Sequence, residues 1–314
     1  SLLNPCKKPM TLGTAQFGMD YGITNSNGQV HLDDAIEIIR SAIAEGIEYI
    51  DTAAAYGNSE KVIGEALSEG WSSRVKIISK MSPFDDFLHK DNREIDWPLH
   101  VRDSVLASCI NLNASSINTL MLHRADHLQN EFIMKELLEL KKEDIIENIG
   151  VSIQNPIELE NALNNYDVSI IQMPFNILDG RWDTMISRIQ AIKKKRGLLI
   201  HARSSLLQGL LCSSNPDKWE TANITNYERI LNWLNHQYKQ HEKVSVSDLC
   251  IGYVNSQDWI DSVVVGVDSK ENLYLNLQSI LMPSMSNKAI LDLQLSRPNL
   301  GEDSLNPSNW KTRV

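Results

Sequence analysis

Short apolar runs alternate with longer segments of helical periodicity along almost the whole chain. A run rich in β-branched residues, a turn and a segment with apolar residues at helical spacing recur about eight times. This pattern predicts strands over residues 11–15, 47–51, 75–80, 117–122, 148–152, 168–173, 198–202 and 262–265. It predicts intervening helices over residues 32–45, 59–68, 97–112, 131–142, 156–164, 185–195 and 228–240.

Several predicted strands are apolar without alternation, as at 77–78 and at the valines 263–265. Parallel strands that are buried on both faces have this composition. A doubly wound sheet is the alternative, but no predicted strand is followed by a glycine-rich phosphate-binding signature. About eight strand–helix units favour a closed barrel. We therefore expect one α/β domain over residues 1–314, a (β/α)8 TIM barrel with its active site at the C-terminal ends of the strands.

Two segments interrupt the regular repeat. The segment 204–261 follows the seventh predicted strand, is long, and has helical patterns at 226–240 and 246–254. Because barrel active sites are formed by the loops after the strands, this segment is a candidate substrate wall or lid. The tail 297–314 is polar, and the sequence leaves open whether it covers the active site.

Composition narrows the range of partners. A net charge of −10 disfavours nucleic acid and anionic membrane surfaces, and the one dense basic run, 193–196, ends a predicted helix, where cations stabilise free carbonyl groups. Cys6, Cys109, Cys212 and Cys250 are widely spaced without a C-x-x-C pair, so neither a disulfide framework nor a zinc site is expected. Without an apolar stretch of about 20 residues or a signal-peptide pattern, we expect a cytoplasmic protein with no membrane partner.

Four polar residues lie at or just after the ends of predicted strands: Asp51, Tyr56, Lys80 and His123. In a parallel barrel these ends meet at one face, so an acid, a phenol, an ammonium and an imidazole should converge there. A nearby ammonium favours the phenolate form of a tyrosine, and a carboxylate holds the ammonium in place. Such a set is suited to give a proton to a carbonyl oxygen that gains negative charge, as in reduction by hydride.

Each of these residues also has a structural interpretation. A strand-end Asp51 can cap a helix, Lys80 can form a plain ion pair, and Tyr56 and His123 can cover the barrel rim. Their joint occurrence on successive strand ends favours catalysis. Schiff-base chemistry at Lys80 is an alternative reaction. Metal-assisted hydrolysis is a weaker one, because His123 and His127 lack a dispersed third ligand, and no metal is expected.

The string GIEYIDTAAAYGNSE at 46–60, followed by IGEAL at 63–67, resembles the aldo-keto reductases, which are NAD(P)(H)-dependent oxidoreductases on a (β/α)8 barrel. The resemblance extends from LGTAQFG at 12–18 to the eighth predicted strand. It implies reduction of an aldehyde or ketone to an alcohol. In the implied catalytic tetrad, Tyr56 is the general acid and base. Asp51 and Lys80 tune it, and His123 orients the substrate carbonyl.

The same resemblance implies a dinucleotide site. Gly13, Thr14 and Ala15 would lie under the nicotinamide ribose, and Ser152 and Gln172 would hold the carboxamide, whose donors and acceptors need partners once buried. The implied cofactor-binding residues are Gly13, Thr14, Ala15, Asp51, Ser152, Gln172, Arg203, Ser204, Leu206, Gly209, Gly266, Val267, Ser269, Asn272 and Asn276.

Three features depart from the family pattern. Ile153 stands where an Asn is usual, and Arg203 stands where an aromatic residue usually stacks on the nicotinamide. A planar guanidinium can also stack, and it adds a fixed charge beside the cofactor or the substrate. Gly266 and Asn272 stand where members that prefer NADPH often carry Lys and Arg for the 2′-phosphate.

Cofactor and substrate are therefore less defined than the reaction. Lys270 could replace the missing cations, whereas Asp268 would repel a 2′-phosphate; by family habit NADP(H) is favoured, with NAD(H) as the alternative. The segment RSSLLQGLL at 203–211 is similar to that of bacterial members associated with surface-sugar synthesis, so a sugar-like or anionic carbonyl substrate is a hypothesis. Candidates for lining its pocket are Tyr21, Phe84, His89, Trp97 and Arg203.

A different function on the same barrel is a regulatory subunit that binds the cofactor as a sensor, with little turnover. The potassium-channel β subunits, which the chain resembles at the same motif, are of this kind. An intact tetrad does not decide between the two functions, and slow turnover with tight cofactor retention would favour the sensor. The sequence does not define the oligomeric state.

Overall fold

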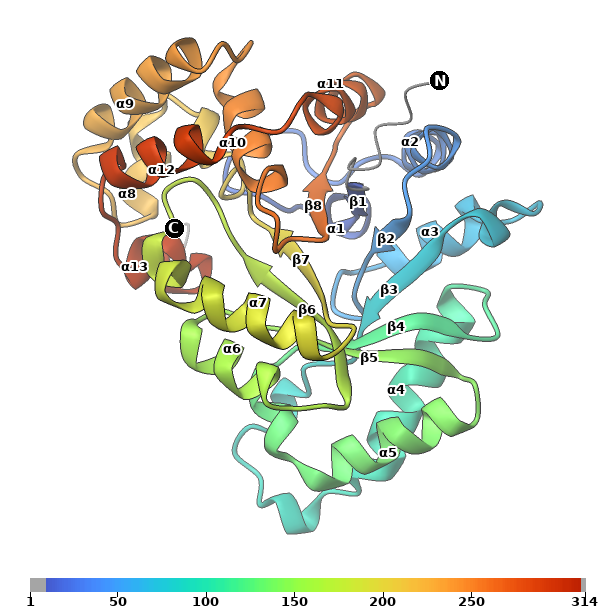
Figure 1. Cartoon of the computed structure of the whole chain (residues 1–314). Helices are drawn as coiled ribbons and strands as arrows, with labels where there is room; N and C mark the ends of the chain where they lie inside the picture. Colours follow the sequence, from blue (N-terminus) through green and yellow to red (C-terminus); the bar gives the residue numbers. More distant parts are fainter. Residues whose placement is uncertain (1–9, 312–314) are drawn as a thin grey trace.

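Eight parallel strands form a closed barrel in which neighbours in sequence are neighbours in space (Figure 1). The computed structural model describes residues 10–311. The predicted α/β fold, a (β/α)8 TIM barrel, is confirmed. The strands are β1 (Met10–Gly13), β2 (Tyr49–Asp51), β3 (Lys76–Lys80), β4 (Ile117–Leu122), β5 (Ile146–Ser152), β6 (Val168–Pro174), β7 (Leu199–Arg203) and β8 (Ser262–Gly266).

Helices surround the barrel. The α-helices are α1 (Ala15–Gly18), α2 (Leu32–Ala44), α3 (Ser59–Ala66), α4 (Trp97–Asn111), α5 (Glu131–Lys142), α6 (Pro156–Leu163), α7 (Ile186–Lys195), α8 (Pro216–Thr221), α9 (Tyr227–Gln240), α10 (Val246–Asn255), α11 (Lys270–Leu281), α12 (Asn287–Ser296) and α13 (Glu302–Leu305). Short 3-10 helices are η1 (Trp71–Arg74), η2 (Asp85–Phe87), η3 (Asn92–Glu94), η4 (Ala125–Gln129), η5 (Gly180–Met185), η6 (Leu210–Cys212) and η7 (Pro307–Asn309).

The barrel closes where β8 pairs with β1. At the C-terminal end of this pair Gly13 lies opposite Gly266, so neither strand end carries a side chain. Below them the hydroxyl groups of Thr11 and Ser262 are 2.7 Å apart and buried. The bare backbone at Gly13 and Gly266 leaves room above the strand ends, where loops of a barrel form the site.

The predicted strand boundaries were wrong by a few residues at several places. The first strand ends at Gly13 instead of residue 15, because residues from Ala15 onward form α1. The fifth begins at Ile146, two residues before its predicted start. Ile47 was placed in the second strand, but it lies before β2 and is nevertheless buried, at 4% exposure. Burial alone therefore does not mark the ends of a strand.

The segment 204–261 contains more structure than predicted. Besides α9 and α10 it holds η6 and α8, a short polar helix with no long apolar stripe for the sequence to reveal. Asn215 caps α8 by accepting a hydrogen bond from the amide of Asp217, at 3.0 Å. Trp219 is fully buried and donates from Nε1 to the Ser213 carbonyl oxygen, at 2.8 Å. This tryptophan anchors the helix.

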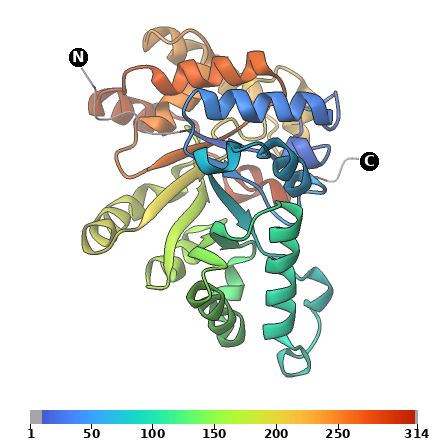
Figure 2. The ribbon, with the colours of Figure 1, turned by 90° about the vertical axis from the view of Figure 1, so that its right-hand side faces the viewer.

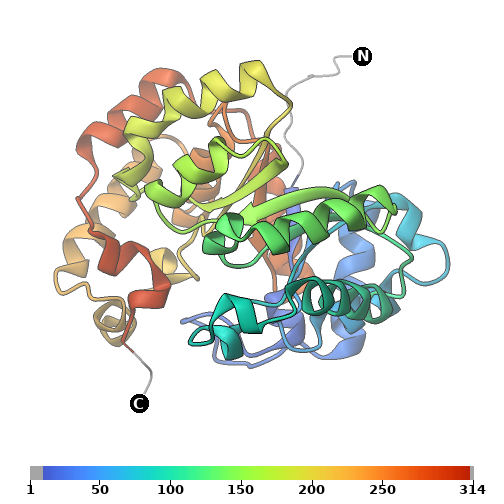
Figure 3. The ribbon, with the colours of Figure 1, turned by 90° about the horizontal axis from the view of Figure 1, so that it is seen from below.

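The C-terminal tail folds back onto this segment, with α13 close to α8 in Figure 3. The side chain of Asn223 donates to the carbonyl oxygens of Asp303 and Asn309, at 3.0 and 3.1 Å. Glu302 forms an ion pair with Arg181 in the loop after β6. The tail up to residue 311 is therefore fixed against the loops on the C-terminal side of the barrel.

The basic run 193–196 lies at the end of α7. Lys193 donates to the carbonyl oxygen of Leu198 at 3.0 Å, and Arg196 donates to that of Leu163 at 3.1 Å. The cysteines that the structure describes are free thiols, whereas Cys6 lies outside the described residues. No helix within residues 10–311 is long and apolar enough to cross a membrane.

Candidate active site

A cavity of about 300 Å³ opens above the C-terminal ends of the strands. It is lined by residues from β1, β2, β6, β7 and β8 and from the loops that follow them. The sequence-predicted site residues among them are Gly13, Thr14, Ala15, Asp51, Tyr56, Gln172, Arg203, Ser204, Leu206, Gly209, Gly266, Asn272 and Asn276.

A buried ion pair lies at the floor of this cavity. The Nζ atom of Lys80 donates to both carboxylate oxygens of Asp51, at 2.9 Å each, and to the carbonyl oxygen of Thr52, at 3.0 Å. Burial acts to lower the pKa of Lys80, but Asp51 and then Tyr56 outweigh it, so the pKa is raised. Lys80 therefore carries its charge at neutral pH, although it is only 1% exposed.

Gln172 completes the environment of the carboxylate. Its Nε2 donates to Oδ1 of Asp51 at 2.7 Å across the barrel. The sequence implied only a role for Gln172 toward a carboxamide, and the bond to Asp51 was not foreseen. Its Oε1 is buried and has no hydrogen-bond partner within the described chain. A buried acceptor without a partner is costly, so this oxygen is suited to accept a hydrogen bond from a bound ligand.

Tyr56 lies between the ion pair and His123. The Lys80 Nζ is 4.9 Å from the centroid of the Tyr56 ring, and the rings of Tyr56 and His123 are 6.0 Å apart and nearly perpendicular, at 86°. Burial, Lys80 and Arg203 lower the pKa of His123 to about 4. The imidazole is therefore neutral at neutral pH and can donate one N–H. The structure thus brings all four predicted catalytic residues together.

Close backbone contact positions the loop that carries Tyr56. A Cβ atom on Gly18 would clash with the carbonyl oxygen of Tyr56, and one on Gly57 would clash with that of Gly18. Gly57 also has a φ of +57°, which favours glycine. Ser59 donates to the carbonyl oxygen of Thr14 at 3.1 Å. Helix α1 and the loop after β2 can therefore approach this closely only because both glycines lack side chains.

Arg203 brings a positive charge to the cavity. Its Nη2 donates to the carbonyl oxygen of Ile153 at 2.7 Å, so two of the three departures from the family pattern contact each other. Burial lowers the pKa of Arg203, and within residues 10–311 no carboxylate forms an ion pair with it. A partly buried charge without a counter-charge favours an anionic ligand.

The loop after β7 forms one wall of the cavity in an unusual conformation. Ser204, Leu207 and Gln208 all have positive φ values, of 65°, 49° and 57°. The Oε1 of Gln208 accepts a hydrogen bond from the amide of Ile23 at 3.2 Å. The backbone carbonyl oxygen of Gln208 accepts one from the Thr24 hydroxyl at 3.2 Å. Loops after β1 and β7 therefore meet beside the cavity.

Several residues that line the cavity had no role predicted from the sequence. The segment 19–30 after α1 had no role assigned beyond Tyr21, which the structure confirms as a lining residue. Its two glycines and two asparagines in YGITNSNG are the only sequence signal of a shaped loop. The lining residues without a predicted role in the site are Gln16, Gly22, Thr24, Asn25, Ser205, Gln208, Val264 and Val265.

Some predicted residues lie outside the cavity wall. Ser152 ends β5 at 5% exposure, Val267 is fully buried, and Ser269 caps α11 by accepting from the amide of Asn272 at 3.0 Å. None of the three lines the cavity. Lys270, considered for a 2′-phosphate, instead lies 2.9 Å from Glu37 of α2 and does not line the cavity either.

Phe84, Trp97 and His89 were candidates for the substrate pocket and are not in the cavity wall. Phe84 and Trp97 pack edge to face, with ring centroids 5.6 Å apart, and both contact the His127 ring. His89 is exposed on the same loop. His127 thus belongs to an aromatic cluster, and no group of three or more metal-ligating side chains occurs within residues 10–311.

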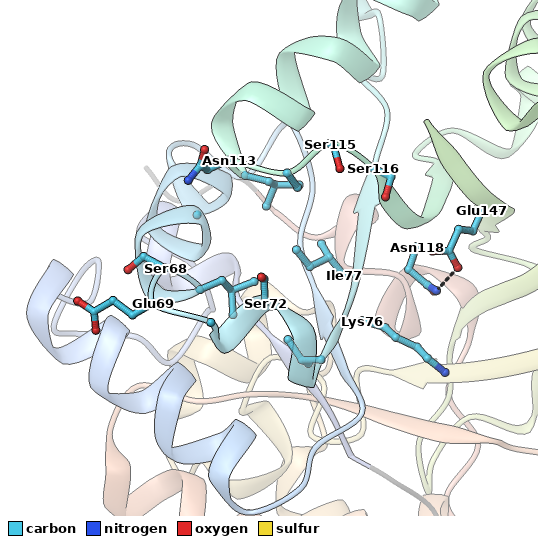
Figure 4. A pocket seen from close by; sticks show the side chains of 16 residues that line it. Ser68, Glu69, Ser72, Lys76, Ile77, Asn113, Ser115, Ser116, Asn118 and Glu147 are labelled. Atoms are coloured by element: carbon cyan, nitrogen blue, oxygen red, sulfur yellow. Dashed lines mark hydrogen bonds between the residues drawn. The ribbon is translucent and has the colours of Figure 1, made fainter. Parts of the chain in front are cut away.

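A second, larger cavity of about 480 Å³ lies at the opposite end of the barrel, near the starts of β3 and β4 (Figure 4). Its wall is polar, and its charged residues are Glu69, Lys76 and Glu147. Lys76 pairs with Glu48 at 3.0 Å, and Asn118 donates to Glu147 at 3.0 Å. The N-terminal end of a barrel contributes to stability more often than to catalysis. The four predicted catalytic residues lie at the other end.

Comparison with known proteins agrees with this geometry. The profile of the Aldo/keto reductase family matches residues 9–293. The NADH-specific methylglyoxal reductase of Escherichia coli is 28% identical over 222 residues, which cover 64% of each chain. The holo form of aldo-keto reductase AKR11C1 from Bacillus halodurans superposes with a TM-score of 0.72 at 19% identity, covering 94% of each chain. An aldo/keto reductase from Klebsiella pneumoniae, in complex with NADP and acetate, gives a TM-score of 0.67 at 18% identity, covering 93% of this chain and 92% of that one. The match of the family profile over most of the chain shows that this protein belongs to the aldo/keto reductase family.

Proposed function

We propose that this protein is an NAD(P)H-dependent reductase that converts an aldehyde or ketone to an alcohol, with Tyr56 as proton donor. Membership of the family supports an NAD(P)H-dependent oxidoreductase. The single observation that carries the finer proposal is the buried Asp51–Lys80 pair beneath Tyr56. A charged lysine is costly to bury, and here it is held within reach of one phenol that faces a ligand-sized cavity.

The cavity has the groups that a nicotinamide dinucleotide requires. Within residues 10–311 the Oε1 atoms of Gln172 and Gln16 are buried without a partner, and an amide group can donate to such acceptors. Gly13 and Gly266 expose backbone, which allows close approach of a ligand. The lining residues named above would hold the dinucleotide, and when bound it would supply the hydride.

Residues of the chain would supply the proton that the carbonyl oxygen receives. The phenol of Tyr56 donates a hydrogen bond to the substrate carbonyl oxygen and transfers its proton as that oxygen gains charge. Lys80 stabilises the negative charge left on the Tyr56 oxygen, and Asp51 holds Lys80 in place. Neutral His123 donates its N–H to the same carbonyl oxygen and so orients the substrate.

The substrate is proposed to carry an anionic or sugar-like group. Arg203 supports the anionic part, because its partly buried guanidinium lacks a carboxylate partner within the described chain. The acetate in the Klebsiella pneumoniae complex shows that a fold relative accepts a small carboxylate. The Klebsiella pneumoniae protein is in complex with NADP, and the Escherichia coli relative is NADH-specific. These two relatives therefore support either dinucleotide as the cofactor.

The test is to follow the loss of NADH and NADPH absorbance with a panel of aldehydes, ketones, aldoses and keto acids. The proposal expects turnover of at least one carbonyl compound, with preference for anionic or hydroxylated ones. Tight binding of a dinucleotide with no turnover of any carbonyl would instead indicate a sensor subunit. Binding of neither dinucleotide would refute the proposal.

A further inference from the structure

We infer that this enzyme selects NAD(H) over NADP(H), and that Asp268 is the residue that sets the preference. The inference rests on the proposed function, since it concerns the cofactor of the same site. It reverses the preference for NADP(H) that family habit suggested.

The cavity has two distinct ends. Asp51, Tyr56 and Gln172 lie at the catalytic end, and Gly266, Asp268 and neighbouring residues lie at the end formed by β8 and the start of α11. The hydride must be delivered next to Tyr56, so the nicotinamide occupies the catalytic end. The adenosine half of the dinucleotide must therefore extend toward α11.

The charges at the α11 end do not match a 2′-phosphate. Arg203 is the only Lys or Arg among the described residues that line the cavity, and it interacts electrostatically with Tyr56 and Tyr21 at the catalytic end. The α11 end presents the carboxylate of Asp268 together with Asn272 and Asn276. Within residues 10–311 no basic side chain forms an ion pair with Asp268.

Lys270 is the nearest cation in sequence, and its charge is already matched. Its Nζ lies 2.9 Å from Oε1 of Glu37, which joins α11 to α2; the two helices lie side by side in Figure 2. Lys270 is not part of the cavity wall. One backbone donor at this end is also occupied, because the Asn272 amide donates to the Ser269 hydroxyl.

The two cofactors differ only at the 2′ position of the adenosine ribose. A phosphate there has a charge of about −1.5 to −2 at neutral pH, and it would lie next to a carboxylate with no cation to offset it. A 2′-hydroxyl instead donates a hydrogen bond to an acidic residue, as in other NAD-selective sites. Asn272 and Asn276 can pair with neutral groups of the adenosine.

Equilibrium titration of the full chain with NADH and with NADPH, followed by protein fluorescence at fixed ionic strength, tests the inference without turnover. We expect NADH to bind at least about tenfold more tightly than NADPH, a difference of about 1.4 kcal/mol. Asp268→Asn should strengthen NADPH binding about tenfold and weaken NADH binding a few-fold. Asp268 is exposed, so this variant should fold.

Glu37→Gln is a second test, and Glu271→Gln is the control. Glu37→Gln should also strengthen NADPH binding, because it leaves Lys270 without its counter-charge. Glu271→Gln removes the same charge from the first turn of α11 at an exposed position outside the cavity wall, and it should leave the NADH-to-NADPH ratio within about twofold of the original. Tighter binding of NADPH by the unmodified protein, or a ratio that Asp268→Asn does not change, would overturn the inference alone. Failure of the folded protein to bind either dinucleotide would refute the proposed function, and this inference with it.

Discussion

The Nζ atom of Lys80 lies 2.9 Å from both carboxylate oxygens of Asp51, and the two side chains are 1% and 5% exposed. Breaking a buried pair on one side leaves an uncompensated charge, whereas neutralising both sides is much less costly. We therefore predict that Lys80→Met lowers the free energy of unfolding by about 3–5 kcal/mol. The double variant Asp51→Asn with Lys80→Met should recover at least half of that loss in chemical denaturation.

We expect turnover and stability to respond differently to these two variants. Both the single and the double variant lack the ammonium beside Tyr56, so both should lose carbonyl reduction. A double variant that regains activity together with stability would show that the pair has only a structural role.

A buried histidine, His201, and a partly buried one, His123, make stability depend on pH. Burial lowers the pKa of His201 to about 4, and neither ring nitrogen has a hydrogen-bond partner within the described chain. In the unfolded chain the pKa returns to about 6.5, so the unfolded state binds more protons between these values. The stability is present above pH 6.5 and is lost as the pH falls toward 4. Each such histidine should remove about 2 kcal/mol between pH 7.5 and 5.

The variant that isolates this effect is His201→Leu, since His201 does not line the cavity. Its pH-dependent loss of unfolding free energy should be smaller than that of the unmodified protein by about 2 kcal/mol. If the free energy of unfolding of His201→Leu, measured in denaturant titrations, depends on pH in the same way as that of the unmodified protein, the assignment of this effect to His201 is wrong. His123, whose pKa is also about 4, should account for a similar part of the remainder.

The contact between Gly18 and the Tyr56 loop predicts an effect of a single methyl group. Gly18→Ala forces apart two backbone segments, and overpacking of this kind costs about 1–3 kcal/mol. Because the displaced segment carries Tyr56, kcat should fall as well. Gly197→Ala is the matched control, since its added Cβ meets nothing within 4 Å, and it should change neither quantity. Equal behaviour of the two variants would argue against a positioning role for Gly18.

Arg203 should influence both His123 and ligand binding. The guanidinium contributes to the low pKa of His123, so Arg203→Gln should raise the pKa of His123 above its value of about 4, as measured by NMR titration. The glutamine can still donate to the Ile153 carbonyl oxygen, so folding should be retained. Binding of anionic ligands should weaken about tenfold. An unchanged pKa of His123 together with unchanged affinity would place Arg203 outside the functional site.

The barrel and the convergence of the four predicted catalytic residues could be predicted from the sequence, because both follow from local patterns. Asp51, Lys80 and His123 each end a recognisable apolar run, and parallel strands bring such ends to one face. The bond from Gln172 to Asp51 joins residues 121 positions apart, so no local pattern encodes it. The cavity wall at Gln208 depends on consecutive residues with positive φ, which their side chains do not favour. Such loops take their shape from tertiary contacts, and these cannot be read from propensity.

Tyr56→Phe tests the central claim most directly, with the rate of carbonyl reduction and the dinucleotide affinity measured on the same preparation. Loss of a positioned general acid costs about 100- to 10,000-fold in rate. The predicted result is a loss of at least about 100-fold in kcat with a dinucleotide affinity within about threefold of the original. Undiminished reduction by Tyr56→Phe would contradict the assignment of Tyr56 as the proton donor.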